Sequence, residues 1–80
     1  MTLKEAKASK KPAIFMRKYD TRRLYFDGKN FYPIYSYTLT VVAGGMYIEN
    51  ITALKGDVAF LDLPADGWRH GFGDLKVEII

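Results

Sequence analysis

Residues 22–43 read RRLYFDGKNFYPIYSYTLTVVA and have the pattern of a β-hairpin. Asp27-Gly28 joins a residue that tolerates positive φ to one that adopts it freely, so we expect the chain to reverse here between two β-prone arms. In the second arm, large apolar side chains alternate with small hydroxyl side chains, which predicts a strand with one buried face. The apolar set is Tyr35, Tyr37, Leu39 and Val41, and the hydroxyl set is Ser36, Thr38 and Thr40.

Further short strands are expected on both sides of this hairpin. Residues 13–19, 46–54, 58–63 and 75–79 are rich in β-branched and aromatic residues, and tight turns or a glycine-rich loop at 64–74 separate them. In the second of these strands Ile48 and Ile51 fall on opposite faces, which indicates a bulge near Asn50 or a helical turn. The pattern predicts an all-β or β-rich α+β protein, a small curled antiparallel sheet or barrel of about five to six strands.

The basic residues are concentrated at the beginning of the chain. Residues 1–30 contain nine Lys or Arg and three acids, whereas residues 31–80 contain three Lys or Arg and six acids. Residues 1–12 combine four lysines with small residues, and a helix of one or two turns is marginal there because Leu3 alone offers an apolar face. We therefore expect a flexible basic tail over residues 1–12 and a single small β domain over residues 13–80.

Composition limits the classes of function. With 80 residues and 49% hydrophobic residues, we expect one small folded domain. No apolar run reaches the ~20 residues of a membrane-spanning helix, and the start lacks the apolar core of a signal peptide, so we expect a cytoplasmic protein with no membrane partner. The chain contains no cysteine, which excludes a disulfide framework, a thiolate nucleophile and a cysteine-ligated zinc.

Catalytic groups are scarce, so we do not expect an enzyme. His70 is the single histidine, and a nucleophilic triad would need Ser36 or a threonine beside it. Asp66 and Asp74 flank His70, but no recognised metal-ligand spacing is present. We expect no catalytic residue, no metal site and no cofactor.

One segment mixes cations with aromatic rings and is a candidate site for nucleic acid. Cations can neutralise phosphates, and flat rings can stack on unpaired bases. The alternative is structural, with strand tyrosines packing and arginines solubilising the surface. The candidate residues are Arg17, Lys18, Tyr19, Arg22, Arg23 and Tyr25.

The same segment resembles part of a known family. Residues 18–25, KYDTRRLY, are similar to the Lys-Tyr-x-x-Arg-Arg-Leu-Tyr segment that begins the DNA-binding domain of polyhydroxyalkanoate-synthesis regulators. The family usually has Asn at the position of Thr21 and Asp at the position of Phe26, and it continues into helices where this chain turns at Asp27-Gly28. The resemblance covers eight residues and implies DNA binding.

The loop at residues 64–74 carries the second candidate site. Trp and Arg are enriched at interface hot spots, and a glycine-rich loop can present them to a partner. Trp68 alternatively folds back as a lid over the small core. Our leading prediction is a non-enzymatic inhibitor or adaptor that docks a β surface and this loop onto a macromolecule, foremost a protein, with nucleic-acid binding as the alternative and self-association as a further option. The partner-binding candidates are Trp68, Arg69, His70 and Phe72.

Overall fold

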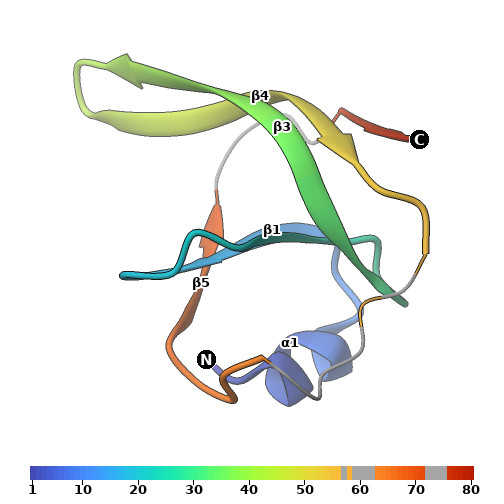
Figure 1. The fold of residues 1–80 in the computed structure, drawn as a ribbon. Helices are drawn as coiled ribbons and strands as arrows, with labels where there is room; N and C mark the ends of the chain where they lie inside the picture. The colour runs from blue at the N-terminus through green and yellow to red at the C-terminus, as the bar shows by residue number, and fades with distance from the viewer. Residues whose placement is uncertain (57, 59–62, 72–75) are drawn as a thin grey trace.

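The protein is a curled six-stranded sheet with one short helix against it (Figure 1). This computed structural model describes residues 1–56, 58, 63–71 and 76–80. The β-rich fold class expected from the sequence is confirmed. The elements are α1 (Leu3–Ser9), β1 (Ala13–Arg17), β2 (Arg23–Phe26), β3 (Phe31–Val42), β4 (Gly45–Ala53), β5 (Trp68–Gly71) and β6 (Val77–Ile79).

The strands lie in the order β5-β1-β2-β3-β4-β6. Strands β1 to β4 form an antiparallel meander, β5 adds antiparallel to the outer edge of β1, and β6 adds parallel to β4. The sheet is therefore mixed rather than purely antiparallel. Within the described residues β5 and β6 are the two outer strands and do not pair with each other, so the sheet stays open and the barrel alternative is wrong.

The expected turn between β2 and β3 is confirmed at Asp27-Gly28. Tyr25 lies opposite Tyr32 in the hairpin, and Gly28 has φ +100°, in the region that glycine adopts without strain. The Asp27 carboxylate accepts hydrogen bonds from the backbone N–H groups of Lys29 (2.8 Å) and Asn30 (2.7 Å). These bonds, that of Asn30 foremost, hold the pKa of Asp27 below its usual value.

Two apolar clusters lie on opposite faces of β1, because successive residues of a strand point to opposite sides. Phe15 belongs to the first cluster, which also contains Leu3, Ala6, Leu24, Phe26, Phe31 and Trp68. Ile14 belongs to the second cluster, with Ile48 and Ile51. The rings of Phe26 and Phe31 stack with centroids 4.5 Å apart, so aromatic packing is a large part of the small core.

A β-bulge in β4 explains how Ile48 and Ile51 bury together. Thr38 pairs with Glu49 and Ser36 pairs with Thr52, so two residues of β4 stand opposite one residue of β3. Asn50 lies inside this irregularity with φ +51°. The extra residue reverses the alternation, which brings both isoleucines to the same cluster. The bulge predicted near Asn50 is confirmed.

The beginning of the chain differs from the expected flexible tail. Helix α1 packs on the sheet, and its Leu3 and Ala6 are buried in the first cluster. Thr2 and Glu5 form a capping box, in which the Thr2 hydroxyl accepts from the Glu5 N–H (3.1 Å) and the Glu5 carboxylate accepts from the Thr2 N–H (3.0 Å). Two buried apolar side chains three residues apart, Leu3 and Ala6, and a good N-cap thus make a seven-residue helix stable in this tertiary setting.

The second half of the chain also departs from expectation. The segment expected to be a loop at residues 64–74 contains β5, and the expected closing strand is shorter, at Val77–Ile79. Of the strand expected at residues 58–63, only Val58 and Leu63 are described, and both pack against the first cluster outside any strand.

Candidate functional site

A tight turn places an aromatic ring and several cations together at one end of β1. The backbone N–H of Asp20 donates to the carbonyl of Arg17 (3.2 Å) and closes the turn. Tyr19 stands at the third position with φ +62°, and its side chain is 96% exposed. The ammonium group of Lys18 lies 5.1 Å from the centroid of the Tyr19 ring. The turn therefore presents a ring that packs on no core residue.

Strand pairing adds two arginines from distant parts of the sequence. Arg23 of β2 and Arg69 of β5 both pair with Met16 of β1, one from each side. Residues opposite one another in antiparallel strands point to the same face, so the two arginines share a face about 10 Å apart, two strand spacings. We call Arg17, Lys18, Tyr19, Arg23 and Arg69 the basic surface; these residues line an open depression of ≈ 620 Å³ beside the turn.

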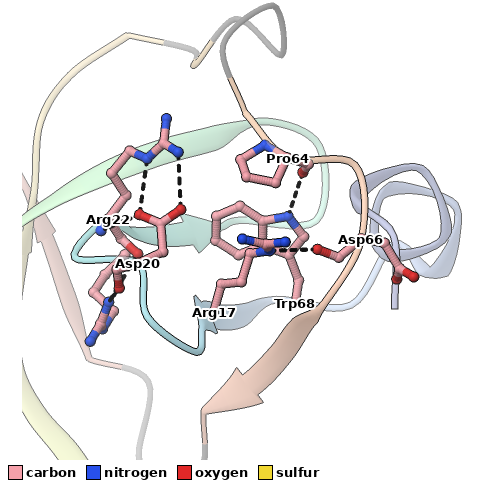
Figure 2. Close-up of polar contacts among 7 residues, drawn as sticks. Arg17, Asp20, Arg22, Pro64, Asp66 and Trp68 are labelled. Carbon is pink, nitrogen blue, oxygen red and sulfur yellow. Dashed lines mark hydrogen bonds and ion pairs between the residues drawn. The ribbon is translucent and has the colours of Figure 1, made fainter.

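Two residues expected at this site have other roles. The Arg22 guanidinium makes two hydrogen bonds of 3.0 Å to the Asp20 carboxylate, which Figure 2 shows as a paired contact. The same contact lowers the pKa of Asp20 to about 2. Tyr25 is half-buried against the second cluster and stacks on Tyr32, with ring centroids 6.3 Å apart. Of the six residues in that prediction, the turn and β2 thus bring four together.

Trp68 is a core residue in this structure. Its side chain is 1% exposed within the first cluster, and its indole N–H donates to the carbonyl of Pro64 (2.8 Å; Figure 2). The Met1 amino group donates to the Trp68 carbonyl (2.9 Å), and the Arg17 Nε donates to the Asp66 carbonyl (2.7 Å). The loop therefore folds back over the core, the second of the two alternatives for Trp68, and the indole is not available to a partner.

The other three partner-binding candidates of that loop, Arg69, His70 and Phe72, do not lie together in one described site. Arg69 is exposed and joins the basic surface. His70 pairs through its backbone with Phe15, but its side chain is not described, and Phe72 and Asp74 lie outside the described residues.

A second surface was not anticipated as exposed. Beyond Ile34, β3 and β4 form a two-stranded ribbon that extends past the rest of the sheet, on the side away from α1 (Figure 1). The face expected to be buried is open there, with Tyr35 69%, Leu39 52% and Val41 70% exposed. We call Tyr35, Tyr37, Leu39 and Val41 the ribbon face. Alternation in the sequence predicted that these side chains share a face, but it does not report how far that face is exposed.

The chemistry available elsewhere in the described residues is limited. A further depression, of ≈ 710 Å³, lies between β4 and β6 and is lined by residues that include Tyr47, Glu49 and Glu78. A hydrogen bond to the Glu49 carboxylate raises the pKa of the Tyr47 hydroxyl. No three His, Asp or Glu side chains gather in the described part of the chain as they would around a metal. None of the described helices has the length and apolar character needed to span a membrane.

Comparison with protein families, characterised proteins and solved structures found no match. The resemblance of residues 18–25 to the polyhydroxyalkanoate-synthesis regulators thus gains no support, and this segment continues into the β2–β3 hairpin rather than into helices.

Proposed function

We propose that this protein is a non-enzymatic binding module, of inhibitor or adaptor type, that docks the β3–β4 ribbon onto a protein partner. The observation that carries the proposal is the ribbon face, where Tyr35, Tyr37, Leu39 and Val41 are all exposed on one side of two strands. Contiguous apolar surface of this kind marks interaction sites in folded proteins. The proposal places the docking surface on the ribbon, because Trp68 is buried.

The charge pattern specifies the partner's chemistry. No charged residue occurs between Lys29 and Glu49, and Glu49 itself points away from the ribbon face, because its neighbour Ile48 is the residue that pairs with Leu39. The ribbon face therefore has no charge to pair with a partner's ions. Burying an unpaired charge against the ribbon face would be costly. The partner surface that fits is therefore uncharged and apolar.

The edges of the ribbon support the same type of partner. Among the described residues, β2 pairs with β3 only at Phe31, Tyr32 and Pro33, and β6 pairs with β4 only at residues 51–53. As far as the described strands show, both outer edges of the ribbon therefore offer backbone groups that a strand of another protein can pair with. A protein partner that presents an apolar strand would use both the face and an edge.

The first step of the test is to identify the partner, by crosslinking with a photoreactive amino acid placed at Leu39 in cells that produce the protein. Calorimetry with the purified components then measures the affinity, and two adjacent valines provide matched variants. We expect Val41→Lys, on the ribbon face, to weaken binding at least about tenfold. Val42→Lys introduces the same charge on the opposite face and should leave the affinity within about threefold.

The outcomes separate the alternatives. Equal affinity for the wild type and Val41→Lys would contradict docking through the ribbon face. A concentration-dependent dimer in analytical ultracentrifugation, lost in Val41→Lys and retained in Val42→Lys, would identify the partner as a second copy. The cytoplasmic location expected from the sequence belongs to this proposal, and cell fractionation tests it.

A further inference from the structure

The conformation of Tyr19 suggests a binding role separate from the ribbon. A turn with positive φ at its third position favours Gly or Asn there, because a larger side chain crowds the backbone. Tyr19 nevertheless occupies that position with φ +62° and 96% of its side chain exposed. Packing gives no compensation for this conformation, since so exposed a ring buries almost no surface. A strained and exposed aromatic residue is a reason to look for a ligand that covers it.

The cations beside the ring are positioned by several elements. Lys18 comes from the turn, Arg23 from β2 and Arg69 from β5, and the last two pair with Met16 on either side. Within the described part of the chain, Lys18 and Arg69 take part in no ion pair. Asp20 is the acid that lines the depression, and it is already bonded to Arg22. Among the described residues, the basic surface therefore has more positive charge than the acids beside it neutralise.

Ring and cations together select among anionic ligands. An acidic protein segment would use the cations but has no need of a projecting ring. In a duplex the bases are stacked on one another, and their faces are not offered to a side chain. A single strand offers both phosphates for the cations and unpaired bases for the ring.

We propose that the basic surface binds single-stranded nucleic acid, with a base stacked on Tyr19 and phosphates held by Lys18, Arg23 and Arg69. This site is independent of the ribbon face, whose residues all lie on β3. Binding is electrostatic and tolerant of sequence, because no base edge is read by a fixed donor or acceptor in the proposal.

The test uses fluorescence anisotropy of a labelled oligothymidylate of about 12 nucleotides at about 50 and about 200 mM salt. Tyr19→Asn removes the ring and suits positive φ, so the fold is kept or stabilised while affinity falls at least about fivefold. Tyr35→Asn removes another exposed ring, from the ribbon, and should not change affinity. Arg69→Gln should lower the slope of log K against log salt by about 0.7, whereas Lys55→Gln should not change it.

Three results would overturn the proposal. The first is the same affinity in Tyr19→Asn as in the wild type, whether its melting temperature is unchanged or raised. The second is equal or tighter binding of a duplex of the same length, which would mean that phosphates alone are recognised. The third is displacement of the oligonucleotide by polyglutamate at equal charge concentration, which would identify an acidic protein as the better ligand.

Discussion

Replacing Gly28 by alanine tests whether residues 10–12, which follow α1, pack against the β2–β3 turn. Gly28 has φ +100°, and a Cβ atom at this position would lie 3.1 Å from the carbonyl oxygen of Lys10. Gly44 (φ +97°) and Gly56 (φ +109°) are matched controls, because a Cβ atom there would meet nothing within 4 Å. At positive φ, an alanine in place of glycine destabilises the folded state by about 1–2 kcal/mol. Alanine also lowers the conformational entropy of the unfolded chain, which stabilises the protein by about 0.4–1 kcal/mol.

We therefore expect Gly44→Ala and Gly56→Ala to destabilise by about 1 kcal/mol. Gly28→Ala adds a backbone clash that only a shift of residues 10–12 can relieve, so we expect about 2 kcal/mol. In a domain of this size each kcal/mol lowers the melting temperature by about 4–8 °C, which differential scanning calorimetry resolves easily. If Gly28→Ala were no more destabilising than both controls, the close approach of Lys10 to the β2–β3 turn would be refuted.

Three further predictions concern the core and one ion pair. Trp68→Ala should destabilise by about 3–5 kcal/mol in urea unfolding, because it removes the largest buried side chain; a stable variant would contradict its burial. Leu3→Ala should cost about 2 kcal/mol or more, whereas Lys4→Ala, exposed on the same helix, should cost little, and equal small effects would restore the flexible tail. NMR titration should give Asp20 a pKa of about 2, so its contribution to stability is present above pH ~4 and is lost as the pH falls toward 2. Arg22→Ala should raise that pKa toward 3.8, and an unchanged value would exclude the ion pair as its cause.

The parts of the fold that sequence predicted are those with local causes. The turn at Asp27-Gly28 is defined by four consecutive residues, so the sequence alone predicts it. The bulge at Asn50 is predicted because Ile48 and Ile51 break the alternation of β4, which is also a local signal. The capping box of Thr2 and Glu5 is an equally local signal, and reading it would have predicted α1.

The parts that sequence did not predict depend on distant contacts. Glycines at 67, 71 and 73 favoured a loop, but pairing with β1 makes Trp68–Gly71 a strand and turns the indole into the core. Arg69 lies near Arg23 only because both strands pair with β1, which no local pattern contains. The ribbon face was expected to be buried because alternation reports which side chains share a face, not whether another layer covers them.

The position of β5 has a consequence for how the chain folds during synthesis. Strands β2, β3 and β4 are neighbours in sequence and can pair as soon as they are made, whereas β1 must wait for its second neighbour at Trp68–Gly71. At ~5–20 residues per second, several seconds pass between the synthesis of Phe31 and that of Trp68, and during this time α1 alone is available to cover the face formed by Phe15, Phe26 and Phe31. In that interval the nascent sheet is a substrate for chaperones and for edge pairing with other chains. The docking of β5 completes the pairing of β1, so the amides of β1 that bond to β5 should be protected from hydrogen exchange only after it has occurred.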